Sequence, residues 1–325
     1  MFINRVKENP FITQSLKTMF LRIVGVVILF GFSLFLTHHY DPKIIGQYDF
    51  IRMVLLVLGS ICILGTDQSI LYFTGILKNN NNYSEVKKVY YKMLLLIGVM
   101  SLFILAGFLL IGEQRITNFL NDKEVYQTIL KSILVLFFYS VTLFNTEVFR
   151  ALESIYIAEL FRNIFKHISI IVGAIILLTI HRESYLIDTF LVGFILLSII
   201  STIIICSYFS KKKSSNQSIS YSYSYIIKKS YPIAISTMAI FLLRTLDVIF
   251  LKKYYGDKVV AQYGVGVKIM TIIAMIIQMV NINISTKIAS LFFAENKSEL
   301  RKTIKNSVRV LALFMVPCLL FVVVF

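Results

Sequence analysis

Six charged side chains lie inside or beside long apolar segments, and they are the residues of this sequence from which we expect chemistry. They are Arg22, Arg52, Asp67, Arg244, Asp247 and Lys268. If the segments cross a membrane, each charge is costly and usually faces a cavity or a partner. Arg244 and Asp247 are three residues apart, so on a helix they can share one face and pair. The pair either holds helices together or opens to let Arg244 attract an anionic substrate, with Lys268 adding positive charge if it faces inward.

Each of the other three positions has a structural interpretation beside the functional one. Arg22 is four residues into the first apolar segment, and Arg52 opens the second. Both either line a cavity or extend to a membrane surface, cytoplasmic for Arg22 and outer for Arg52. Asp67 lies in the polar stretch Leu64-Gly65-Thr66-Asp67-Gln68-Ser69. Its carboxylate needs a cation, a proton or a hydrogen-bonded partner, and it serves either a ligand or a contact between helices.

Other polar residues give no sign of catalysis. Arg150, Arg162 and Lys166 gather between two apolar segments, where they either anchor a cytoplasmic loop or bind lipid headgroups. The sequence has no nucleotide-binding loop, HExxH motif or DxD pair. Its cysteines lack CxxC spacing, and its histidines lack partners at metal-ligand spacing. We therefore expect neither an enzyme nor a cofactor or metal.

The composition indicates that the chain lies in a membrane and not in water. Hydrophobic residues make up 57%, charged residues 15%, and the mean hydropathy is +0.79. A soluble protein carries about 25% charged residues, so this chain is expected to cross a membrane several times. The net charge of +16 lies mostly in short gaps between apolar segments. That placement favours contact with membrane lipids over a nucleic-acid partner.

Nine apolar segments are long enough, or nearly so, to span a bilayer. They are Met19–Leu36, Ile51–Ile76, Tyr91–Ile111, Ile129–Phe149, Ile164–Ile180, Tyr185–Phe209, Pro232–Leu251, Tyr263–Ile284 and Val308–Phe325. The segments are continuously apolar and do not alternate as barrel strands would. The predicted fold class is all-α and transmembrane. A cytoplasmic N-terminus leaves roughly twice as many lysines and arginines inside as outside, although Lys252 and Lys253 count against it.

An internal duplication predicts how the helices are grouped. The stretch Lys43-Ile44-Ile45-Gly46-Gln47-Tyr48 recurs 215 residues later as Lys258-Val259-Val260-Ala261-Gln262-Tyr263. Likewise Ser84-Glu85-Val86-Lys87-Lys88 returns after 214 residues as Ser298-Glu299-Leu300-Arg301-Lys302. Six predicted spans separate the copies, and an even number gives both the same orientation. We therefore expect two parallel helical bundles related by an axis along the membrane normal.

The predicted bundles occupy unequal lengths of the chain. The first covers residues 1–210, a cytoplasmic connector covers 211–230, and an incomplete second bundle covers 231–325. Phe325 corresponds to Ile111 of the first copy. A complete second copy would need about three more helices, or on the order of 110 further residues, so we expect a truncated product or a fragment.

Several short motifs resemble those of a known transporter family. Gly46-Gln47-Tyr48 and its echo Ala261-Gln262-Tyr263 resemble a signature of polysaccharide-export flippases. So do Leu64-Gly65-Thr66-Asp67 and the spacing of Arg244 and Asp247. By these motifs and by its layout the chain resembles Wzx-type O-antigen and capsule flippases, within the MATE-like superfamily, over essentially all 325 residues.

This resemblance implies a V-shaped, alternating-access cavity between two six-helix bundles. It also implies a cargo of undecaprenyl-diphosphate-linked oligosaccharide, moved from the cytoplasmic to the outer leaflet of the bacterial inner membrane, with H⁺ or Na⁺ as a possible coupling ion. Six residues would then bind substrate: Arg22, Arg52, Asp67, Arg244, Asp247 and Lys268. Four of them are cations that would neutralise the diphosphate, while Gln68, Asn281 and Asn283 would contact sugars.

Three other functions remain open at this point. A cation-coupled multidrug exporter of the same superfamily would be favoured by a cavity lined with carboxylates. A membrane-embedded glycan polymerase would need a large outer loop, yet the longest predicted outer gap, Gly112–Thr128, is short. A membrane scaffold without transport activity is the third.

Overall fold

The computed structural model describes residues 10–79, 82–212, 221–270, 274 and 297–324. These residues form helices joined by short turns, and none of them forms a strand. The helices are α2 (Pro10–His39), α3 (Pro42–Ile63), α4 (Thr66–Asn79), α5 (Tyr83–Ile111), α6 (Glu113–Leu120), α7 (Val125–Ala151), α8 (Ile155–Leu160), the π-helix η1 (Phe161–Phe165), α9 (Lys166–Thr179), the 3₁₀ turn η2 (Glu183–Tyr185), α10 (Leu186–Lys211), α11 (Tyr223–Tyr255) and α13 (Lys297–Val324). A further helical stretch covers 257–270. The chain forms two compact units, Met1–Gln262 and Tyr263–Phe325.

Seven helical segments of the described chain are long and apolar enough to cross a membrane. They are Phe20–His39, Pro42–Ile63, Tyr83–Ile111, Val125–Ala151, Ile155–Thr179, Glu183–Lys211 and Tyr223–Tyr255. The all-α transmembrane prediction is therefore confirmed, and the chain is a multi-pass membrane protein. The predicted span Tyr263–Ile284 lies largely outside the described residues, while Val308–Phe325 falls, except for its last residue, within α13.

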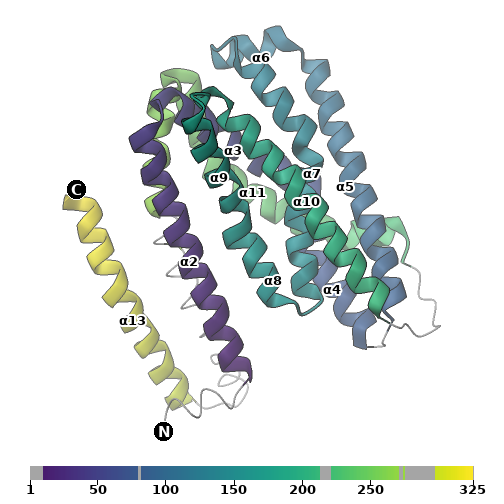
Figure 1. Ribbon diagram of the computed structural model, residues 1–325. Helices are drawn as coiled ribbons and strands as arrows, with labels where there is room; N and C mark the ends of the chain where they lie inside the picture. The colour runs from purple at the N-terminus through teal and green to yellow at the C-terminus, as the bar shows by residue number, and fades with distance from the viewer. Residues whose placement is uncertain (1–9, 80–81, 213–220, 271–273, 275–296, 325) are drawn as a thin grey trace. The chain divides into compact units, whose positions relative to one another are not determined.

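Helix α7 is the centre of the first unit. It contacts α3, α4, α5, α8 and α10, while α2 packs against α8, η1 and α9 (Figure 1). We call the side that holds α6 and the α2–α3 turn the α6 end, and the opposite side, with the α7–α8 turn, the α8 end. An amide joins α7 to its neighbours α5 and α10: Asn145 accepts a hydrogen bond from Tyr90 (3.1 Å) and donates to Ser201 and Thr202 (2.9 Å each). Such polar contacts hold helices together where apolar side chains are as soluble in lipid as in protein.

The second predicted span is not one helix, and the prediction of Ile51–Ile76 is wrong. Leu64 (φ 53°) and Gly65 (φ 71°) both adopt left-handed backbone angles, which end α3 and let α4 start in a new direction. The sequence stays apolar on both sides of this break, so hydropathy could not predict where α3 ends. A Cβ on Gly65 would lie 2.5 Å from the Ser230 carbonyl oxygen, so glycine also permits the close approach of α11.

Helix α3 also begins earlier than its hydropathy indicated. Asp41 accepts a hydrogen bond from the Lys43 amide (2.7 Å), and Pro42 occupies the first turn, both typical of a helix start. The prediction that Arg52 opens its helix is therefore wrong. Arg52 lies ten residues beyond Pro42, or about 15 Å along the helix.

One helix start recurs at the spacing of the predicted duplication. Pro42 begins α3, and a helix begins again at Asp257, 215 residues later. The counterpart of the α5 start at Tyr83 borders residues outside the described part of the chain, so the spacing of 214 is not tested. The offset of 215 is what a duplicated ancestor would leave. Helix α11 begins at Tyr223, inside the predicted connector 211–230, and the division into bundles 1–210 and 231–325 stays a prediction.

Substitution of Gly46 by Ala should destabilise the fold. A Cβ at Gly46 would meet the backbone oxygen of Asp257 at 1.9 Å, so α3 would have to move away from the helix that starts there. Overpacking of this kind costs about 1–3 kcal/mol. We expect a lower midpoint of thermal unfolding in detergent for Gly46→Ala, but not for Gly107→Ala, whose Cβ would meet open space. Equal midpoints would contradict the close contact.

Candidate functional site

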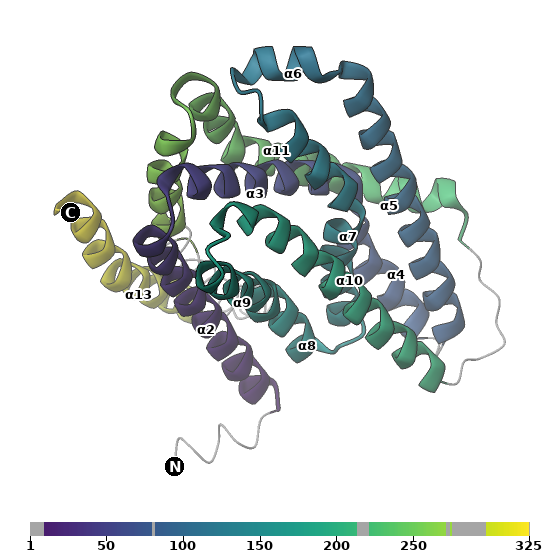
Figure 2. The ribbon, with the colours of Figure 1, turned by 45° about the horizontal axis from the view of Figure 1, so that its top comes forward.

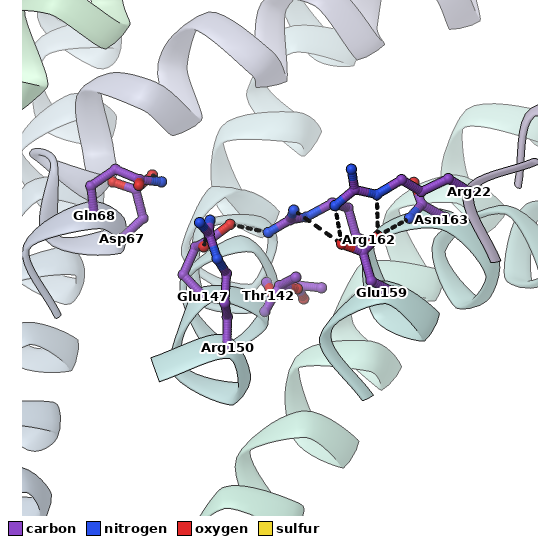
Figure 3. A network of polar contacts seen from close by, with 10 residues as sticks. Arg22, Asp67, Gln68, Thr142, Glu147, Arg150, Glu159, Arg162 and Asn163 are labelled. Carbon is purple, nitrogen blue, oxygen red and sulfur yellow. Dashed lines mark hydrogen bonds and ion pairs between the residues drawn. The ribbon is translucent and has the colours of Figure 1, made fainter. Parts of the chain in front are cut away.

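An ion pair with two hydrogen bonds joins α2 to α8. The Arg22 guanidinium binds the Glu159 carboxylate with two hydrogen bonds, Nε to Oε2 at 3.1 Å and Nη2 to Oε1 at 2.5 Å (Figure 3). The Glu159 side chain is 4% exposed and that of Arg22 is 23% exposed. A two-point pair of this geometry fixes the direction of both side chains. Arg22 therefore points into the protein instead of extending to a membrane surface.

Further polar contacts connect this pair to η1 and to α7. Asn163 donates to Glu159 Oε2 at 2.6 Å, and an Arg162 nitrogen lies 3.7 Å from Glu159 Oε1. Arg162 also binds Glu147 of α7, and Glu147 accepts a second hydrogen bond from Arg150 at 3.2 Å. The dashed contacts of Figure 3 therefore form one chain from Arg150 to Arg22.

This chain carries more positive than negative charge. Three arginines share two glutamates, so one positive charge is left without a matching carboxylate in the network. We call the six residues of this chain the arginine network: Arg22, Glu147, Arg150, Glu159, Arg162 and Asn163. Its members come from α2, α7, α8 and η1, and π-helical turns such as η1 are common at functional sites.

A second group of cations lies beyond the arginine network. The positive charges of Arg162 and Arg52 lie close enough to Lys166 to repel it, and His167 faces both Lys166 and Arg52. Arg52 Nη2 is 3.4 Å from Asp49 Oδ1, but Arg52 Nε is buried without a hydrogen-bond partner. Within the described residues, Lys166 makes no ion pair or hydrogen bond. Arg52 and Lys166 therefore retain capacity to bind an anion.

The depth of this second group places it near the middle of the bilayer. Arg52 is about 15 Å from the start of α3 at the α6 end, and Lys166 is about 16 Å from the start of α8 at the α8 end. A hydrocarbon core about 30 Å thick puts both near its midplane. Transporters commonly hold their substrates at that depth.

The other predicted site residues make no hydrogen bond or ion pair with these groups among the described residues, but Asp67 lies close enough to Glu147 for the two carboxylates to repel each other (Figure 3). Asp67 sits in the first turn of α4, where Gln68 Nε2 donates to its carboxylate at 3.3 Å. Asp247 of α11 accepts a hydrogen bond from the Val248 amide at 2.9 Å. The Arg244 side chain is outside the described residues, and so is its predicted pairing with Asp247.

Three further predicted residues belong to the second unit. Lys268 is 5% exposed within the unit Tyr263–Phe325. Asn281 and Asn283, the predicted sugar contacts, lie outside the described residues. Of the six predicted substrate-binding residues, the described part of the structure therefore brings Arg22 into the arginine network and Arg52 and Asp67 to its edge.

Sequence reasoning missed the two carboxylates that organise the site. Glu147 lies within the predicted span Ile129–Phe149, so its position in an apolar segment was an available signal. Glu159 gave none, because it falls in the gap before the predicted span Ile164–Ile180. The helical segment begins nine residues earlier, at Ile155, which places Glu159 inside the bundle.

A separate charge cluster lies at the α6 end. Lys252 Nζ is 2.6 Å from Asp122 Oδ2 and 2.5 Å from Asp257 Oδ1, and the Lys252 side chain is 3% exposed. Burial acts to raise the pKa of Asp122, but the hydrogen bond and charge of Lys252 outweigh it and lower the pKa below its usual value. Metal binding has no support in the described part of the chain, where no group of three or more His, Cys, Asp or Glu could hold an ion.

Neutralising Glu159 should cost far more stability than neutralising an exposed carboxylate. Glu159→Gln leaves Arg22 with no charged partner in a buried site, and breaking such a pair costs about 3–5 kcal/mol. Asp188→Asn is the matched control, because Asp188 pairs with Lys131 on the surface, where a pair contributes at most about 1 kcal/mol. Thermal unfolding of the purified variants measures both, and equal losses would show that the Arg22–Glu159 pair is not structural.

The comparisons with known proteins agree with a membrane protein of this layout. A family model described as polysaccharide biosynthesis protein matches residues 63–283, which is more than half of the chain. The matched region includes α4 to α11 and therefore both glutamates of the arginine network. Searches of curated proteins and of solved structures gave no match. On the strength of the family match, the chain belongs to the polysaccharide biosynthesis protein family.

Proposed function

We propose that the protein moves a lipid-linked oligosaccharide across the bacterial inner membrane, with the diphosphate of the cargo held by buried cations. The N-terminus and the α8 end would face the cytoplasm, and the α6 end would face outward. The observation that carries the proposal is the excess of positive charge inside the membrane-spanning part of the first unit.

A polyprenyl diphosphate is a suitable ligand for this charge. Its phosphates are anionic and stay near the membrane because the lipid tail remains in the bilayer. Guanidinium groups bind phosphate oxygens in a two-point geometry, and they keep their charge even when buried. The arginine network and Arg52 supply such groups on α2, α3, α7 and η1, and Lys166 of α9 adds an ammonium group. A neutral cargo would give no reason to keep these charges unmatched in a bilayer.

The two cation groups offer the diphosphate successive positions. The arginine network is nearer the α8 end, because Glu159 is only four residues from the start of α8 and Glu147 four from the end of α7. Arg52 and Lys166 are deeper, near the midplane. A diphosphate entering from the cytoplasmic leaflet would meet the network first and the deeper pair second. Sugars would contact polar residues such as Gln68, whose side chain is half-buried at the start of α4.

The charge balance favours this cargo over that of the runner-up. A cation-coupled drug exporter would need carboxylates free to bind a cation. Glu147 and Glu159 are both occupied by arginines, which leaves Asp67, bonded to the Gln68 amide, as the nearby carboxylate without an arginine partner among the described residues. We also propose that the protein transports its cargo without changing it covalently. The discriminating observation is the fate of the lipid-linked sugar: a transport defect leaves it complete and trapped in the cytoplasmic leaflet.

Deletion of the gene tests the proposed function. We expect the deletion strain to lose surface polysaccharide and to accumulate complete lipid-linked repeat units on the cytoplasmic side, measured by glycan staining and by enzymatic access to the lipid in inside-out vesicles. Unchanged surface polysaccharide would refute the proposal. Accumulation of shortened or unpolymerised glycan at the outer leaflet would instead indicate a polymerase.

Removal of either deep cation should impair export. Lys166→Gln and Arg52→Gln each delete a charged hydrogen-bond donor that contributes about 1.5–3 kcal/mol, equivalent to at least about tenfold weaker binding. We expect a comparable fall in surface polysaccharide at low cargo supply, with unchanged amounts of protein in the membrane. Lys131→Gln is the matched control, because that lysine is exposed and pairs only with Asp188. An equal effect of all three substitutions would contradict a specific role for the pair.

A further inference from the structure

Helix α11 belongs to the second copy by sequence but to the first unit by contact. The compact unit that contains α2 to α10 extends to Gln262 and therefore includes the whole of α11. Figure 2 shows α11 running alongside α3, and α11 also contacts α4 and α6. Its attachments are of three kinds, and they occur at the α8 end, in the middle and at the α6 end.

Aromatic side chains fasten α11 at the α8 end. Tyr221, just before the helix, and Tyr225 in its first turn pack their rings edge-on against Phe73 of α4, with centroids 5.0 and 6.1 Å away. Lys229 Nζ lies over the rings of Tyr72 and Tyr225. Lys92 of α5 donates a hydrogen bond to the Tyr221 carbonyl oxygen at 2.6 Å. These contacts tie the start of α11 to two helices of the first copy.

In its middle part, α11 packs closely against α4 and the α3–α4 break. The Ser69 and Ser230 hydroxyls hydrogen-bond at 2.6 Å, and both side chains are buried. At the α3–α4 break, a Cβ on Gly65 would lie 2.5 Å from the Ser230 carbonyl oxygen and 2.7 Å from the Ala234 amide nitrogen. Helices this close have no space for lipid or water between them, so sliding or tilting either helix would create clashes.

A buried charge fastens α11 at the α6 end. Lys252, in the last turn, binds Asp122 of the α6–α7 turn and Asp257 of the following helix, and its Nζ lies 5.8 Å from the centre of the Phe50 ring of α3. Withdrawal of α11 would separate Lys252 from Asp122 and leave its buried ammonium with Asp257 alone, which is unfavourable in an apolar environment. Val260 and Ala261 are also buried within the first unit. The fastened stretch therefore continues past the end of α11.

We propose that α11 is a fixed wall of the first bundle and stays docked on α3 and α4 throughout transport, so that it does not move with the rest of the second copy. The reference to transport rests on the proposed function; the permanent docking does not. The connection between α10 and α11 is then not the hinge about which the two copies move. Alternating access would reshape the surface that lies beyond α11, while the α3–α11 contact keeps its geometry.

A disulfide across the middle contact tests this proposal. Ser69→Cys and Ser230→Cys are introduced together in the protein, after replacement of its native cysteines, with a protease site placed within 213–220. The two fragments stay joined on a non-reducing gel only if the disulfide has formed. We expect near-complete cross-linking in membranes and, once cross-linked, the same surface polysaccharide as in the reduced protein. Ser69→Cys with Ser236→Cys, on an exposed face of α11, is the matched control and should not cross-link.

Two results would overturn the proposal. Cross-linking that stays partial at long oxidation times would show that the contact opens. Loss of surface polysaccharide on oxidation, restored by a reducing agent, would show that opening is required. Failure of the proposed function appears differently, because the reduced and wild-type proteins would then both fail to support polysaccharide export, and the extent of cross-linking alone would decide the docking.

An unmodified protein provides a second measurement if the cysteine pair does not fold. A carbodiimide joins an amine to a carboxylate only in direct contact, and Lys252 Nζ meets Asp122 Oδ2 at 2.6 Å. Mass spectrometry of membranes treated with it should find the Lys252–Asp122 cross-linked peptide in amounts that do not change when lipid-linked cargo is supplied or withheld. A yield that falls with cargo would show undocking at the α6 end and refute a fixed wall.

Discussion

A charged side chain inside a bilayer must find its counter-charge within the protein, and this requirement shapes the first unit. Glu159 meets it for Arg22 with two short hydrogen bonds, and the same carboxylate draws Arg162 and Asn163 toward it. Because Arg22 is on α2 and Glu159 on α8, the pair fixes the position of α2 against the rest of the bundle. Glu147 repeats the arrangement for Arg150 and Arg162 across α7 and η1. Three arginines share these two glutamates, so the network keeps one positive charge that the two carboxylates do not neutralise.

Sequence analysis predicted the fold class and most of the helices because long apolar runs are a direct record of burial in lipid. It failed where local backbone geometry decides the outcome. The α3–α4 break depends on left-handed angles at Leu64 and Gly65, which leave the hydropathy unchanged. The start of α3 depends on the Asp41 cap and Pro42, and missing it displaced Arg52 from mid-membrane to a surface.

The candidate site was predictable only in part, because ion pairs between distant helices leave no trace in spacing. Arg22 was recognisable as a charge within an apolar segment, but its partner is 137 residues away. Lys166 was interpreted as a loop anchor, since the helix that carries it begins well before its apolar part. The duplication and the two bundles inferred from it stay predictions, although its spacing of 215 does relate the helix start at Asp257 to that at Pro42.

The π-helical turn at Phe161–Phe165 determines which charges can neutralise each other. In an uninterrupted α-helix, Glu159 and Lys166 would lie seven residues apart on the same side, two turns from one another. A π turn accommodates one extra residue, and each residue advances the helix by about 100°, so everything after η1 is out of phase with α8 by roughly that angle. Lys166 is thereby rotated off the side of the helix that carries Glu159, although the Glu159 charge still acts on it. Deletion of one residue within η1 would remove the π turn and keep this rotation, because Glu159 and Lys166 would then be six residues, or about 600°, apart in a regular helix, and the lysine charge would stay without a partner on its own helix.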